Sequence, residues 1–159
     1  NAPARRKTRE FALQVLFAAE TLNKSPLKTL KFLESHFESD SEKVVQMDRV
    51  SMDFADALIT AVSHHKDAID NIISEYSENW KLHRINQVDR NILRMAIAEM
   101  STFPETPTAV ILNEAIEIGK KYGVENSGAF INGVLDRIRS VGLDLLLGAD
   151  QTKVDDELD

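Results

Sequence analysis

Residues 86–100 read NQVDRNILRMAIAEM, and they are the strongest evidence in the sequence for its fold class. Its apolar side chains recur every three or four residues, which is the spacing of one helix face. These side chains are Val88, Ile92, Leu93, Ala96, Ile97 and Met100. Because they cover much of the circumference, we expect this helix at the centre of a helical core. Asn86 is its predicted N-cap, and Phe103-Pro104 is its predicted end.

The same spacing continues on both sides of this segment. It predicts further helices over about residues 5–20, 26–37, 47–62, 68–76, 107–122 and 127–138. The predicted helix boundaries are Ser25-Pro26, Thr106-Pro107, Gly123 as a stop, and Asn126 or Ser127 as the last cap. No stretch alternates apolar and polar side chains for long enough to predict a strand. Seven helices with short loops predict an all-α, bundle-like domain.

Several classes of function are excluded by what the 159 residues lack. There is no cysteine, which excludes disulfides, cysteine-based zinc sites and thiol nucleophiles. There is no glycine-rich phosphate loop, no His-Glu-x-x-His pair and no Gly-x-Ser-x-Gly elbow. We therefore expect no catalytic residue, metal or cofactor, and predict a binding protein rather than an enzyme. No apolar run reaches the roughly 20 residues of a membrane span, and no signal-peptide pattern opens the chain, so a cytoplasmic location is expected.

Charge is distributed unevenly along the chain, whose formal net charge is −7. Residues 1–9 hold no acid and four cations, which are Arg5, Arg6, Lys7 and Arg9. Each cation in the first turns of a helix costs about 0.3–1 kcal/mol against the helix dipole, so we expect a bound anion to offset it. Phe17 lies off the apolar stripe, and stacking of an unpaired base on its ring favours single-stranded RNA. The alternative is that residues 1–7 are a frayed arm and Phe17 belongs to the core.

Four segments resemble the NusB family of transcription antitermination factors. The first is ARRKTRE at residues 4–10, and the second is the central helix at residues 84–100. The other two are ILNEAIEI at residues 111–118 and FINGVLD at residues 130–136. The resemblance covers roughly residues 4–20 and 76–138, whereas residues 21–75 agree only in their helical pattern.

The resemblance implies a fold and a set of partners. We expect one all-α domain over residues 1–147, with sub-bundles at 1–75 and 76–147, followed by an acidic disordered tail at 148–159. The family is not enzymatic, and its members bind boxA RNA together with the ribosomal protein NusE. They do so in an antitermination complex on RNA polymerase, mainly on ribosomal RNA operons. Some relatives form homodimers, so a homodimer is also possible here.

The resemblance also implies site residues. Those expected to contact RNA are Arg5, Arg6, Lys7, Arg9, Phe17, Asn126 and Ser127. Those expected to contact the protein partner are Glu75, Asp89 and Arg90. Asp89 has a second interpretation, since the third residue after Asn86 is well placed to serve the helix start.

Other positions in these segments are interpreted as structural. We expect Asn113 and Asn132 to be hydrogen-bonded amides inside the fold, and Gly133 to mark a close helix contact. Phe130 is a predicted core residue, and Trp80 a predicted lid on the junction of the sub-bundles.

Two other functions stay open at this point. One is a helical protein-interaction module without an RNA role. The other is a detached RNA-binding domain of an RNA cytosine methyltransferase.

Overall fold

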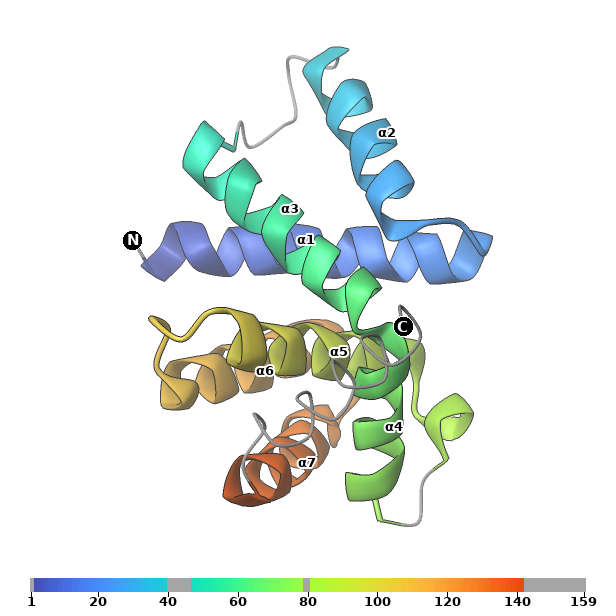
Figure 1. The fold of residues 1–159 in the computed structure, drawn as a ribbon, viewed down its shortest axis with the longest axis vertical. Coiled ribbons are helices and arrows are strands. Elements are labelled where there is room, and N and C mark those ends of the chain that lie inside the picture. Colours follow the sequence, from blue (N-terminus) through green and yellow to red (C-terminus); the bar gives the residue numbers. More distant parts are fainter. Residues whose placement is uncertain (1, 40–46, 79–80, 142–159) are drawn as a thin grey trace, which may run out of the picture. The chain divides into compact units, whose positions relative to one another are not determined.

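The structure, a computed structural model, describes residues 2–39, 47–78 and 81–141, and every regular element in these ranges is helical (Figure 1). The elements are α1 (Ala2–Leu22), α2 (Pro26–Ser39), α3 (Arg49–His64), α4 (Lys66–Tyr76), η1 (Leu82–Arg84), α5 (Gln87–Thr102), α6 (Thr108–Tyr122) and α7 (Ser127–Val141). This confirms the all-α class and the seven α-helices predicted for this part of the chain. The short 3-10 turn η1 lies where a loop was predicted. Trp80 and the acidic tail at 148–159 lie outside the described residues.

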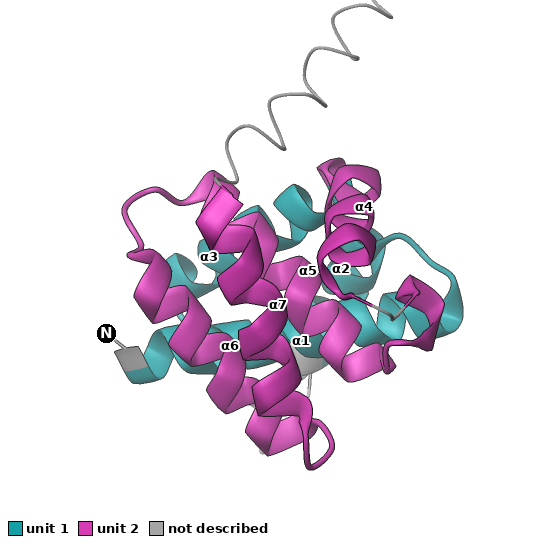
Figure 2. Ribbon diagram, turned by 90° about the horizontal axis from the view of Figure 1, so that it is seen from below, with its two compact units in different colours: residues 1–63 teal, residues 64–159 magenta. Residues whose placement is uncertain are grey.

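The chain divides into two compact units, Asn1–Ser63 and His64–Asp159, which Figure 2 draws in two colours. The division falls earlier than the expected boundary after residue 75, because α4 belongs with the second unit. α4 packs against α5 and α7, and it buries Ile69, Ile72 and Ile73. No helix in the described ranges has the length and hydropathy of a membrane span.

The first unit begins with α1, which packs against α2. The apolar stripe predicted for α1 is buried as expected, at Ala12, Val15, Leu16 and Ala19. α1 ends at Leu22 and is followed by Asn23, whose φ of 52° is the left-handed conformation in which asparagine substitutes for glycine. The amide of the next residue, Lys24, donates to the carbonyl of Ala19 at 2.9 Å, which completes a Schellman turn. Ser25 and Pro26 then start α2, as the sequence predicted.

In the second unit α5 is the central helix, in contact with α4, α6 and α7. Residues 91–99 are all buried, which confirms the prediction from its wide apolar surface. Asn86 is the N-cap: its side-chain oxygen accepts from the Asp89 amide at 2.9 Å, and its Nδ2 donates to the Asp89 carboxylate at 2.9 Å. Phe103 ends the helix as predicted. α6 starts one residue later than expected, with Pro107 at the cap position.

The prediction of a close helix contact at Gly133 is wrong. A Cβ added there would lie 3.9 Å from the end of the Arg137 side chain and meet nothing nearer. The close approach between α6 and α7 occurs instead at Gly119, where a Cβ would lie 2.6 Å from Cδ1 of Ile131. The close approach therefore involves Gly119 of α6 rather than Gly133 of α7.

The predictions for three further side chains of α6 and α7 also need correction. Asn113 and Asn132 are exposed, because both lie on the outer faces of their helices. Neither is a buried structural amide. Phe130 is only half-buried rather than part of the core.

Candidate functional site

The basic segment predicted to bind RNA is part of α1 and not a frayed arm, since the helix starts at Ala2. A helix turns about 100° per residue, so side chains four apart share a face. Arg5 and Arg9 therefore share the face of the buried Ala12 and Leu16, and Arg9 is only 5% exposed. The four cations consequently divide into two pairs with different surroundings.

The inward pair, Arg5 and Arg9, meets one aromatic ring of α3. The guanidinium carbon of Arg5 lies 3.9 Å from the centroid of the Phe54 ring, and that of Arg9 lies 5.6 Å from it. Both distances are within the range of cation–π attraction. Phe54 is 7% exposed, so its ring is a fixed part of the first unit.

Arg5 has one further distinctive feature. Its Nη1 is buried, and no residue that the structure describes hydrogen-bonds to it. The pKa of Asp48 is lowered, mainly because its carboxylate accepts a hydrogen bond from the Ser51 amide. The positive charge of Arg5 makes a smaller contribution in the same direction. That amide donates to Oδ1 of Asp48 at 2.8 Å, so Asp48 caps the start of α3. Positive charge thus lies beside the first turn of α3.

The other two cations, Arg6 and Lys7, lie off the face that Arg5 and Arg9 share, and we call them the outward pair. Lys7 is exposed and Arg6 is half-buried. The exposed surface continues through Gln14 and Thr21, each seven residues further along, with Phe17 between them. Phe17 is 38% exposed, which confirms that it lies off the buried stripe. This face carries a cation pair at one end and an aromatic ring about three turns away.

The two RNA contacts predicted just before and at the start of α7 differ in their exposure to solvent. Asn126 is exposed, whereas Ser127 is 1% exposed. The Ser127 hydroxyl accepts a hydrogen bond from the Val124 amide at 2.8 Å, inside a turn that begins at Gly123. A Cβ on Gly123 would lie 2.6 Å from Cβ of Ser127, so the two residues are packed together. The prediction of a ligand contact by the Ser127 side chain is therefore wrong: this hydroxyl closes the turn.

The three residues predicted to contact the protein partner also differ in their exposure and hydrogen bonding. Glu75 is exposed near the end of α4. Asp89 is 3% exposed and bonded to Asn86, which supports its interpretation as a helix-start residue. Arg90 donates through Nη1 to the carbonyl of Ile85 at 2.5 Å, and so fastens η1 to α5. Of the two carboxylates among them, Glu75 is the exposed one.

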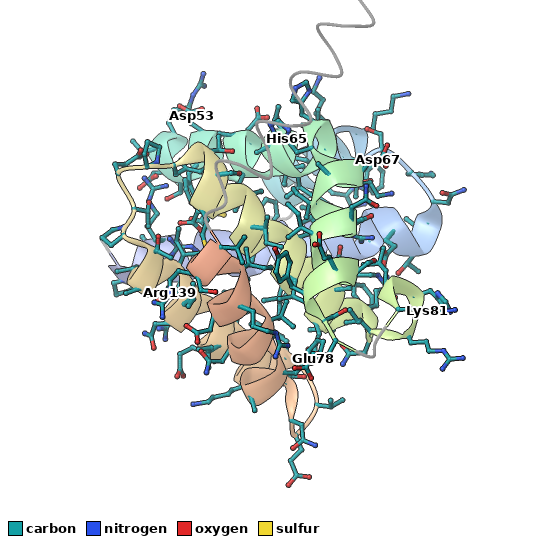
Figure 3. All side chains as sticks on the ribbon, turned by 60° about the horizontal axis from the view of Figure 1, so that its bottom comes forward. Asp53, His65, Asp67, Glu78, Lys81 and Arg139 are labelled. Carbon is teal, nitrogen blue, oxygen red and sulfur yellow. The ribbon has the colours of Figure 1, made fainter. Side chains whose placement is uncertain are left out.

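Two arginines missed by the sequence analysis hold the second unit together. Arg94 makes a forked ion pair with Asp70 of α4, with Nε–Oδ1 2.7 Å and Nη2–Oδ2 3.2 Å. Arg137 of α7 donates to the Tyr76 carbonyl at 3.0 Å and to the carboxylate of Glu78 at 2.9 Å. Glu78 is labelled in Figure 3. Arg94 bonds to a residue 24 positions away and Arg137 to one 61 positions away, and periodicity alone gives no signal for such pairs. Across the described ranges, no cluster of three or more histidine, aspartate or glutamate side chains is placed to hold a metal ion.

Comparison with known proteins gives a consistent result. The model of the NusB family matches residues 6–140. The transcription antitermination protein NusB of Myxococcus xanthus is 42% identical over 135 residues, which are 85% of this chain and 94% of that protein. Its counterpart from Geotalea daltonii is 42% identical over 137 residues, 86% of this chain and 94% of that protein.

Solved structures agree with this result. T. maritima NusB has a TM-score of 0.74 and 36% identity, over 84% of this chain and 89% of that chain. A chain from the complex of antitermination factors NusB and NusE with dsRNA has a TM-score of 0.72 and 25% identity, over 88% of this chain and 98% of that chain. By sequence and by fold, this chain belongs to the NusB family.

Proposed function

We propose that this chain is a transcription antitermination factor that binds boxA-like single-stranded RNA together with the ribosomal protein NusE. In this role it joins an antitermination complex on RNA polymerase in the cytoplasm and promotes transcription of ribosomal RNA operons. The relatives support the antitermination role by name, and a related NusB has been solved with NusE and RNA. The matched relatives are named as antitermination proteins and not as methyltransferases, so the family match favours this role over that of a methyltransferase domain.

The observation that carries the RNA-binding role is the exposed face of α1. Lys7 and Arg6 lie at its start and Phe17 lies further along, on a chain whose net charge is −7. A local cation pair on an acidic chain attracts a polyanion at that place, whereas the acidic parts of the surface repel it. In the proposed complex Lys7 and Arg6 neutralise phosphates, and the ring of Phe17 stacks on a base.

The inward arginines have a different part in the proposal. Phe54 holds the guanidinium groups of Arg5 and Arg9, which adds positive potential beneath the RNA. The Nη1 of Arg5 is buried and has no hydrogen-bond partner among the described residues, so a phosphate oxygen would reach it only after a local rearrangement. Asn126 is an exposed polar side chain for a further RNA contact, and Glu75 is the exposed carboxylate proposed to face NusE.

Single-stranded RNA is proposed because a base must leave its helical stack to lie on Phe17. The related complex was solved with dsRNA, so the strandedness is open to a direct comparison. The informative experiment is a titration with a boxA-like strand, a scrambled strand and the boxA-like duplex, each with and without NusE, at several salt concentrations.

Salt dependence separates the alternatives. Four phosphate contacts to a single strand give a slope of log K against log salt of roughly −3, and two give roughly −1.4. We expect Arg6→Ala with Lys7→Ala to reduce the slope by roughly 1.4. Lys66→Ala, which removes an exposed lysine from the other unit, is the matched control and should leave the slope unchanged. A wild-type slope near zero would leave the protein-interaction module as the function.

The resemblance also predicts that the free chain can form a homodimer. Sedimentation of the RNA-free protein tests it, since a dimer that covers α1 would dissociate on addition of RNA.

A further inference from the structure

A second exposed face with cations and aromatic rings lies on α2, and no site residue discussed so far belongs to it. Its members are five exposed residues at helix positions i, i+3, i+4, i+7 and i+8: Lys28, Lys31, Phe32, Ser35 and His36. At about 100° per residue, these five side chains fall within roughly 140° of the circumference. We call this set the α2 face.

Phe32 is unusually exposed for a large apolar residue of the α2 face. It is 60% exposed, although a large apolar side chain gains roughly 1.5–3 kcal/mol when it is buried. Its ring stacks on the imidazole of His36, with centroids 4.8 Å apart and planes 27° apart. The two rings therefore form a wide aromatic surface open to solvent.

Positive charge lies immediately beside this aromatic surface. Lys28 is one turn before Phe32 on the same side of α2, and Lys31 adjoins it. Among the described residues, neither ammonium group has an ion-pair partner, and the nearest described carboxylate in the helix, Glu34, lies outside the arc of the face. The α2 face is thus cationic on a chain of net charge −7.

From this arrangement we infer that the α2 face is a second contact surface for single-stranded RNA. An acidic peptide would use the lysines, but its carboxylates would make no stacking contact with the two rings. A nucleic acid strand uses both, since phosphates meet the lysines and a base stacks on Phe32. The first unit then has two such surfaces of like composition, since α1 presents Lys7 and Phe17. The inference rests on the proposed function, because it lengthens the RNA footprint beyond the α1 face.

A longer footprint makes a prediction about RNA length. A second contact on the same strand binds at high effective concentration, so it strengthens binding only to RNA long enough to reach it. The test measures affinity for the boxA-like core, for the core extended by ten unpaired nucleotides at either end, and for an unrelated unpaired strand of the same total length. We expect one extended strand to bind the wild-type chain more tightly than the core.

Two variants of the α2 face locate the effect. Phe32→Ala should weaken binding to the extended strand by about 5- to 150-fold, which corresponds to the loss of one stacked base. Lys28→Ala with Lys31→Ala should reduce the salt slope for that strand by about 1.4. Neither variant should change binding to the core. The matched control is Leu22→Ala, which truncates an exposed apolar residue of the same unit, and circular dichroism checks that each variant is folded.

The possible results distinguish this inference from the proposed function. If the core binds and extension adds nothing, the α2 face is not an RNA surface, and the proposed function stands. If Phe32→Ala weakens binding to both the extended strand and the unrelated strand, and the boxA-like sequence binds no more tightly than the unrelated one, the inference holds and boxA recognition fails. If the lysine changes weaken binding but Phe32→Ala does not, the face is a general cationic surface that also suits an acidic protein, and the inference is overturned.

Discussion

The contact between Arg5 and Phe54 leads to the sharpest prediction about stability. A cation–π pair contributes about 0.5–1 kcal/mol when exposed and about 2 kcal/mol when desolvated. Arg5 is half-buried, Phe54 is 7% exposed and the separation is 3.9 Å, so we expect a coupling of about 1–2 kcal/mol. Arg9 lies 5.6 Å from the same ring, near the limit of the interaction, and should couple by about 0.5 kcal/mol.

The measurement is a double-mutant cycle read by urea unfolding. Phe54→Leu removes the π face while it keeps an apolar side chain in the core, and Arg5→Gln removes the charge while it keeps most of the length. The coupling is the amount by which the double variant departs from the sum of the two single variants. Arg6→Gln combined with Phe54→Leu is the control, because Arg6 points to another side of α1 and should add without coupling. A coupling below about 0.3 kcal/mol for Arg5 would show that the ring does not hold the guanidinium group, and the division of the cations into two pairs would lose its basis.

Three further predictions concern the rest of the fold. Asp70→Asn should destabilise the chain by about 2–4 kcal/mol in urea unfolding, because it leaves the charge of Arg94, whose side chain is 7% exposed, without its partner. Gly133→Ala should stabilise by about 0.5–1 kcal/mol through helix propensity, whereas Gly123→Ala should destabilise, because its Cβ would lie 2.7 Å from the Gly119 carbonyl; thermal unfolding compares the two. Asp48→Asn should cost stability at pH 7 and cost progressively less as pH falls through and below the usual carboxyl pKa of 3.8, as measured by urea unfolding across pH.

The sign of the Asp48 effect follows from its pKa. The fold lowers that pKa, so the ionised carboxylate stabilises the native state above the unfolded-state value. The contribution disappears once pH falls below the lowered value, where wild type and Asp48→Asn become alike. A difference between the two proteins that persists unchanged at pH 2 would contradict a role for the charge.

Much of the fold could be predicted from local pattern. The wide apolar surface of α5 and its N-cap Asn86 were both readable, because helix period and capping chemistry are properties of neighbouring residues. The exposure of Phe17 followed in the same way from its position off the stripe.

The contacts that could not be predicted are those between residues far apart in the sequence. The spacing already places Arg5 and Arg9 on the same helix face as the buried apolar side chains of α1. Only the tertiary structure shows that their guanidinium groups contact the ring of Phe54. The predictions for Ser127 and Gly133 were wrong for a different reason. The identity of a small residue does not reveal which neighbour it faces, and that neighbour decides whether the residue binds a ligand, packs against a helix or closes a turn.

The ion pair between Arg94 and Asp70 has a practical consequence for work in solution. Its side chains are 7% and 17% exposed, so dissolved ions have little access to the charges. Phosphate contacts on open surfaces are instead steeply weakened by salt. Raising the ionic strength should therefore release the nucleic acid from an intact protein, so that a wash with concentrated salt yields ligand-free material for crystallisation without chemical denaturants.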